Sequence, residues 1–174
     1  NNLRMFRMLE EKQKTLESNL EELQKEKHIL EALCVDYTSF YLCDLANDTM
    51  ETIKQSVHSN WAEIDGMTEL KSGYTSRIRY YYDHYVIRES APDFLQKMER
   101  HALIEYLRNH KRFAYRYQSV KNHAGHEYFE LQVIRLETGN RDDYKIIMGF
   151  RYIDDIVQED MKKKQQMEET MADL

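Results

Sequence analysis

The chain has 174 residues, of which 41% are hydrophobic and 32% charged, and its formal net charge is −6. This length suits one domain with a buried core plus an extension. The acidic balance argues against the basic face typical of nucleic-acid binders. No apolar run approaches the ~20 residues that a bilayer-spanning helix needs. We therefore expect contact with neither nucleic acid nor membrane.

The two cysteines, Cys34 and Cys43, form no CxxC pair, and no signal peptide opens the sequence. Isolated thiols are typical of a reducing compartment, so we expect a cytoplasmic protein. The sequence starts without an initiator methionine and ends within a predicted helix. It therefore has the character of a fragment from a longer protein.

Residues 3–35 contain no glycine or proline and predict one long helix. Apolar residues recur with a heptad period, which predicts a coiled coil over residues 1–34. Polar Gln13 and Lys27 at the a positions favour a parallel homodimer. The alternative is a single amphipathic helix packed against its own domain. The d positions are Leu9, Leu16, Leu23 and Leu30, and the a positions are Phe6, Gln13, Leu20, Lys27 and Cys34.

The next segments predict a hairpin and then helices. Residues 36–45 and 50–57 are β-prone and flank a turn signal at 46–49. Residues 58–73 are polar and mixed, and we expect short helical turns and loops there. Residues 74–90 carry aromatic side chains at helical spacing. Ser90 is then expected to cap a helix over residues 93–110, with Pro92 in its first turn.

Three strand-like runs follow, at residues 112–120, 127–137 and 144–153. Their connections contain glycine with asparagine or aspartate, as hairpin loops do, and Gly125 is expected at positive φ. Consecutive strands joined in this way are antiparallel. The predicted fold class is α+β: a five-stranded antiparallel sheet with helices on one face, between two exposed helices. The predicted division is 1–34, 35–154 and 155–174.

The sequence "GFRYIDDIVQED" at 149–160 passes from strand to helix with almost no loop between them. Asp154 or Asp155 is expected to cap the helix, because Asp155 and Gln158 have the spacing of a capping box. A junction without slack can transmit a shift of the sheet as a rotation of the helix.

Three segments together resemble PAS sensory domains of bacterial signalling proteins. They are "ILEALCVDYTSFYLCDLANDTMETI", "RFAYRYQSVKNHAGHEYFELQVIRLE" and "IIMGFRYIDDIVQED", and the resemblance covers about residues 33–157. It implies a non-catalytic sensory or dimerisation module that precedes a GGDEF diguanylate cyclase or a histidine kinase. At the exit, Tyr152 stands where the family motif usually has aspartate, and Asp154 stands where it has threonine.

No catalytic motif of the common hydrolase, zinc-peptidase, P-loop or dinucleotide-binding types is present, so we expect no enzymatic activity in this chain. His123 and His126 lie in a predicted turn without further metal ligands, which predicts a solvated turn. His101 is the only reasonable haem ligand on a PAS helix. Neither cysteine matches a photoreceptor flavin motif. We expect no cofactor and no metal.

The remaining candidate is a pocket for a small organic or anionic ligand between the sheet and the helices. An inward-facing arginine would bind a carboxylate or phosphate, whereas an outward-facing one would cover apolar surface. The tyrosines are candidates for ligand contacts or for core packing with hydrogen-bonded tips. A cavity filled by its own aromatic side chains would support the alternative function, a ligand-free dimerising spacer. The candidate ligand-binding residues are Tyr81, Tyr85, His101, Tyr115, Arg116, Tyr117, Tyr128 and Arg135.

Overall fold

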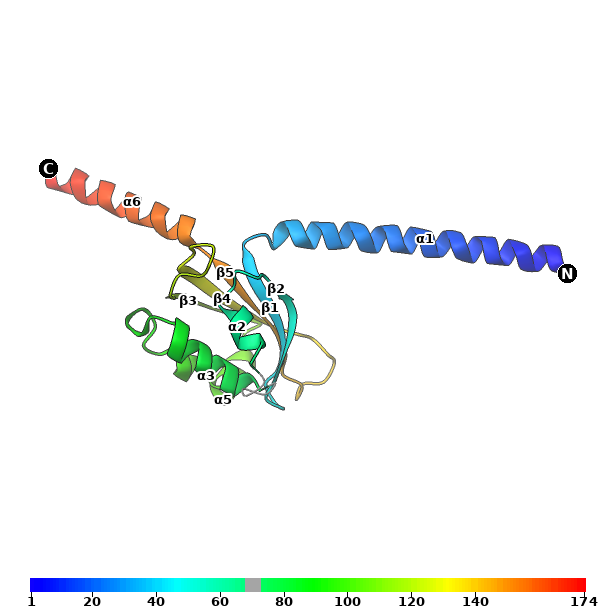
Figure 1. Ribbon diagram of the computed structural model, residues 1–174, viewed down its shortest axis with the longest axis horizontal. Coiled ribbons are helices and arrows are strands. Elements are labelled where there is room, and N and C mark those ends of the chain that lie inside the picture. The colour runs from blue at the N-terminus through cyan, green and yellow to red at the C-terminus, as the bar shows by residue number, and fades with distance from the viewer. Residues whose placement is uncertain (68–72) are drawn as a thin grey trace. The chain divides into compact units, whose positions relative to one another are not determined.

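The computed structural model describes residues 1–67 and 73–174, and the chain divides into two compact units, Asn1–Asp36 and Tyr37–Leu174. The first unit is helix α1 (Asn2–Leu33), and the asparagine side chain of Asn1 caps it by accepting from the Leu3 amide at 3.0 Å. The predicted N-terminal helix is thus confirmed (Figure 1). Part of the segment predicted as short turns, residues 68–72, lies outside the described residues.

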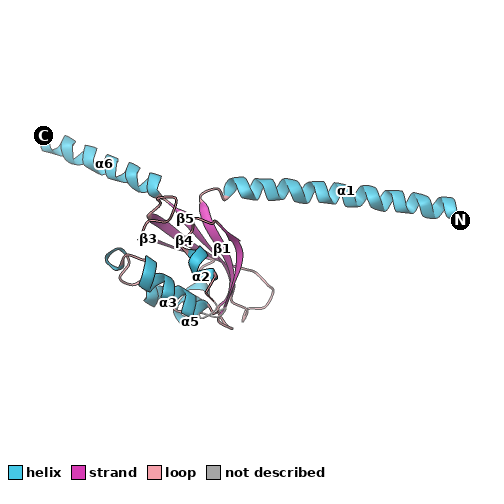
Figure 2. Ribbon diagram, viewed as in Figure 1, coloured by secondary structure: helices cyan, strands magenta, loops and turns pink. Residues whose placement is uncertain are grey.

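The second unit contains a five-stranded antiparallel sheet with strand order β2-β1-β5-β4-β3. Figure 2 shows these strands in magenta. The predicted α+β class and the five antiparallel strands are confirmed. The strands are β1 (Tyr37–Asp44), β2 (Thr49–Gln55), β3 (Arg112–Gln118), β4 (Tyr128–Arg135) and β5 (Lys145–Tyr152).

Short helices connect β2 to β3 and cover one face of the sheet (Figure 1). The faces differ because side chains alternate along each strand. Tyr41, Met148 and Leu131 point toward the helices and are fully buried. The covering elements are α2 (Trp61–Asp65), α3 (Tyr74–Tyr85), the 3-10 turn η2 (Arg88–Ser90), α4 (Phe94–Met98) and α5 (Arg100–Leu107), and the chain ends in α6 (Asp154–Ala172).

The prediction of one helix over residues 93–110 is wrong, because Glu99 interrupts it. Its backbone is extended, with φ −58° and ψ 138°, and its carboxylate accepts from the Ala102 amide at 2.9 Å as the cap of α5. The predicted capping role of Ser90 is also wrong. The Ser90 hydroxyl accepts from the Gln118 amide at 2.9 Å and so attaches the chain to the end of β3.

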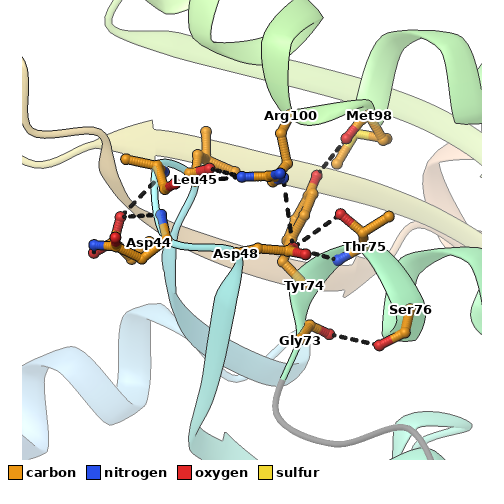
Figure 3. A network of polar contacts seen from close by, with 11 residues as sticks. Asp44, Leu45, Asp48, Gly73, Tyr74, Thr75, Ser76, Met98 and Arg100 are labelled. Carbon is orange, nitrogen blue, oxygen red and sulfur yellow. Dashed lines mark hydrogen bonds and ion pairs between the residues drawn. The ribbon is translucent and has the colours of Figure 1, made fainter.

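The turn between β1 and β2 is anchored to the helices through Asp48 (Figure 3). Asp48 has φ 56°, and its carboxylate accepts from the Thr75 amide and hydroxyl, both at 2.8 Å. A carboxylate from a distant turn therefore satisfies donors at the start of α3, where the helix dipole favours negative charge. Arg100 of α5 lies 3.6 Å from the same carboxylate and donates to the Leu45 carbonyl at 2.9 Å.

At two positions the structure explains why the residue is glycine. Gly125, in the loop between β3 and β4, has φ 84°, which confirms the expected positive φ. Gly149 lies on the face of β5 away from the helices, beneath the stacked rings of Tyr37 and Phe40. A Cβ at position 149 would lie 2.8 Å from a ring carbon of Tyr37 and 2.9 Å from one of Phe40.

We predict that Gly149→Ala destabilises the domain by about 1–3 kcal/mol, because the added methyl group overpacks the site under two rings. Urea denaturation followed by circular dichroism measures this change. The matched control is Gly66→Ala, where the nearest atom to a new Cβ is a backbone oxygen at 3.6 Å. Equal stability of the two variants would contradict the close packing at Gly149.

Candidate functional site

Aromatic rings fill the space between the sheet and the helices. The indole of Trp61 stacks on Tyr81 with centroids 4.6 Å apart and an interplanar angle of 24°. Phe150 of β5 lies 4.9 Å from Trp61 and 5.4 Å from Tyr81, measured between ring centroids. All three side chains are at most 1% exposed. The side chains themselves therefore occupy the region where a ligand pocket was expected.

Tyr81 and Tyr117 meet at the centre of this cluster. Their hydroxyl oxygens are 2.5 Å apart, and both side chains are buried. Burial disfavours the charged phenolate and raises the pKa of both tyrosines above the usual range. Each hydroxyl satisfies the other, so these two predicted site residues act as core packing with paired polar tips.

Tyr85 and Tyr115 lie at the rim of the cluster and bind carboxylates. The Tyr85 hydroxyl donates to Glu63 of α2 at 2.5 Å, and the Tyr115 hydroxyl donates to Asp93 ahead of α4. Burial and the adjacent carboxylate together raise the pKa of each tyrosine. In return, the hydrogen bond from Tyr115 lowers the pKa of Asp93. The Tyr85 contact joins α3 to α2, and the Tyr115 contact holds the start of α4 against β3.

Arg116 and Tyr128 lie on the outer face of the sheet. Arg116 donates to the buried carboxylate of Glu130 at 2.8 Å, and Arg151 of β5 reaches its other oxygen at 2.9 Å. Burial acts to raise the pKa of Glu130, but hydrogen bonds from Arg116 and Gln132 and the charge of Arg151 outweigh it and lower that pKa. The strand alternation in the sequence left open whether Arg116 faces the helices or the outer face. In the structure its side chain lies on the outer face.

The last two candidates lie elsewhere. His101 is exposed on α5. Arg135 is half-buried at the end of β4, with its guanidinium 4.2 Å from the ring centroid of Tyr144. The structure therefore brings Tyr81, Tyr85, Tyr115 and Tyr117 into one aromatic cluster. The other four candidates, Arg116 and Tyr128 on the outer face, His101 and Arg135, lie outside it.

The junction between β5 and α6 is tied directly to the start of β4. The Ile153 amide donates to the Tyr128 carbonyl at 2.8 Å, and Ile153 is 3% exposed. The carboxylate of Asp154 accepts from the amides of Glu127 and Tyr128 at 3.1 and 3.3 Å. The N-cap residue of α6 and its first residue are thus both hydrogen-bonded to the start of β4.

The predicted capping of α6 is wrong. Its N-cap residue is Ile153, and no side chain caps it. Asp154 cannot serve as the cap because its carboxylate is directed to β4. An aspartate directly after a strand was visible in the sequence, but its partner lies 26 residues earlier in the chain. No pattern in the neighbouring sequence pointed to Tyr128 as that partner.

His126, in the loop between β3 and β4, packs against the end of β5 next to the junction with α6. Its ring stacks on Tyr152, the last residue of β5, with centroids 3.8 Å apart and an interplanar angle of 9°. The prediction of a solvated turn therefore holds for the exposed His123 but not for half-buried His126.

Among residues 1–67 and 73–174, no group of three or more histidine, cysteine or acidic side chains is arranged to hold a metal ion.

The register between β1 and β5 brings the two ends of the domain together. Tyr37, the first residue of β1, pairs with Arg151, which precedes the last residue of β5. The strand that follows α1 thus begins beside the strand that enters α6. This pairing and the Asp154 contacts define the candidate functional site, a strand-to-helix junction.

In comparison with known proteins, no protein-family model and no curated protein matches the chain. Within the part of the chain that the structure describes, no helix has the length and apolar character needed to cross a membrane.

We predict that Asp154→Ala speeds hydrogen exchange at the Glu127 and Tyr128 amides by about tenfold, because both lose a charged acceptor. Exchange followed by NMR or mass spectrometry measures this effect. Asp155→Ala is the matched control, since it removes the same charge from the same helical turn. Equal exchange rates in the two variants would show that the Asp154 contacts contribute nothing to the junction.

Proposed function

We propose that this chain is a non-catalytic PAS-type module that dimerises through α1 and relays dimer geometry through the sheet to α6. The observation that carries the proposal is the pairing of Tyr37 with Arg151. It joins the start of β1 to the end of β5, so a displacement at the end of α1 has a short hydrogen-bonded route to α6.

The need for a partner is supported by the surface of α1. The helix has no buried residue, and the apolar residues of its heptad seam are 58–68% exposed. A continuous apolar seam on a charged helix is stabilised when it packs against a second helix. The exposed seam residues are Phe6, Leu9, Leu16, Leu20, Leu23 and Leu30.

The filled interior favours dimer geometry over ligand occupancy as the signal. Trp61, Tyr81 and Phe150 pack in direct ring contact where a small molecule was expected. A ligand there would have to displace buried aromatic rings, which dominate core energetics. This disfavours a ligand-gated sensor and leaves two ligand-free alternatives, the relay of dimer geometry and a passive dimerising spacer, which the insertions near Glu159 distinguish.

The output side of the proposal rests on the resemblance of the sequence to PAS modules. By that resemblance, α6 leads to a diguanylate cyclase in the full-length protein, with a histidine kinase as the alternative. The rigid start of α6 at Ile153 and Asp154 supports a lever, because both residues are bonded to β4. A flexible linker would absorb the displacement.

We predict that mild oxidation links two chains through Cys34. A parallel, in-register coil brings the two Cys34 residues together at one end, whereas an antiparallel coil separates them by about the length of α1, ~48 Å at 1.5 Å per residue. Non-reducing electrophoresis detects the covalent dimer. Cys34→Ser should abolish it, and Cys43→Ser should leave it unchanged because Cys43 is fully buried.

Sedimentation without oxidant provides the control for association. Removing residues 1–30 should give a monomer, since the heptad seam is lost. A tight dimer that persists after this deletion would contradict dimerisation through α1. A dimer of the intact chain that forms no Cys34 link would contradict the parallel orientation.

We predict that insertions near Glu159 alter output in a length-dependent way. Each added residue rotates the downstream helix by about 100°, whereas seven residues nearly restore the phase of a coiled coil. In the full-length protein, insertions of one to three residues should change or lock output activity, and a seven-residue insertion should largely restore it. Output that ignores insertion length would make α6 a passive tether.

A further inference from the structure

A groove whose charged lining residues are mostly basic lies at the end of the sheet opposite α6. It is formed by the end of α5, the turn that follows it and the loop between β4 and β5, and its volume is about 490 Å³. Binding sites for small molecules have volumes of ~300–1,000 Å³. Four cationic side chains and one carboxylate line it, in a chain whose net charge is −6. They are Arg108, Lys111, Arg135, Arg141 and Glu137.

Arg135 is held rigidly in this groove. Its guanidinium donates to the carbonyls of Leu107 at 3.2 Å and Arg141 at 2.8 Å, and it lies over the ring of Tyr144. These contacts join α5 to the loop between β4 and β5. They satisfy donors of Arg135 but leave its positive charge uncompensated, because carbonyl groups carry no net charge.

Other half-buried arginines of the domain have a carboxylate partner. Arg77 lies 3.4 Å from Asp65, Arg100 lies 3.6 Å from Asp48 and Arg151 lies 2.9 Å from Glu130. In the described part of the chain, no ion pair involves Arg135 or Arg141. A partly buried charge without a counterion is costly, and a bound anion would relieve that cost.

The other charges of the groove are paired at its edges. Lys111 lies 3.3 Å from Glu137, and Arg108 lies 2.7 Å from Glu105. Asp142 and Asp143 follow Arg141 in the loop, and the carboxylate of Asp143 lies 4.0 Å from Lys145. After these pairings, the positive charges of Arg135 and Arg141 and the negative charge of Asp142, which is exposed, remain. Arg141 is exposed, and its backbone is fixed by the hydrogen bond from Arg135.

We propose that this groove binds a small polyanion, with Arg141 donating hydrogen bonds to it and Arg135 supplying fixed positive charge. Guanidinium groups match the geometry of both phosphate and carboxylate oxygens. The ligand class is therefore a small molecule with two or more phosphate or carboxylate groups. This proposal is independent of the relay and would stand if the chain were a monomer.

The test is isothermal titration calorimetry of the full chain at constant ionic strength, with inorganic pyrophosphate and citrate as the probes. We expect saturable binding of at least one probe at millimolar concentration, and the tighter probe identifies phosphate or carboxylate as the recognised group. Arg141→Glu should weaken binding by about tenfold or more, because it replaces a charged donor by a repelling carboxylate.

Lys121→Glu is the matched control, since it makes the same change of charge at an exposed position in the loop between β3 and β4. It should change the affinity by less than about twofold, because exposed distant charges are screened by salt. Thermal unfolding checks that both variants fold. Absence of binding by both probes would overturn the proposal, as would equal weakening in the two variants, which would indicate a response to net charge alone.

Discussion

The pairing of β1 with β5 is the constraint on which the rest of the domain depends. It joins residues more than 100 positions apart, from Tyr37 with Arg151 to Asp44 with Lys145, and makes one sheet from two separate groups of antiparallel strands. Closing so long a loop costs conformational entropy, which the buried interior must offset. Gly149 serves this pairing directly, because its missing side chain lets the rings of Tyr37 and Phe40 lie on β5. The same pairing places the start of β1 beside the entry to α6.

The tyrosine-rich composition is explained mainly by the interior and its rim. Rings of Tyr81 and Tyr117 fill the centre, while Tyr85 and Tyr115 reach carboxylates at the edge. Each ring contributes apolar contact area, and each hydroxyl finds a partner without needing solvent. Such a core holds the helices to the sheet in one arrangement. That rigidity suits a domain proposed to transmit geometry, and small-molecule binding is proposed only at the surface.

Strands β4 and β5 connect the two sites inferred here. At one end, Asp154 and Ile153 bind the start of β4, and at the other end Arg135 organises the loop that links the strands. Their central residues pair in register from Phe129 with Tyr152 to Arg135 with Ile146. On the outer face of the sheet, Glu130 of β4 forms ion pairs with Arg116 of β3 and Arg151 of β5, and these pairs bridge the three strands. A continuous hydrogen-bonded hairpin therefore runs from the basic groove to the junction with α6.

The sequence alone determined the features that depend on neighbours in the chain. The helical period of α1, the alternation of the strands and the positive φ of Gly125 follow from local sterics and burial patterns. Only the tertiary structure decided which strands meet, which face Arg116 occupies, and that Asp154 binds β4 instead of capping α6. It also decided that Glu99 divides the predicted helix into α4 and α5. These outcomes depend on contacts between segments that are distant in the sequence. The free energy of such contacts cannot be deduced from a local pattern of residues.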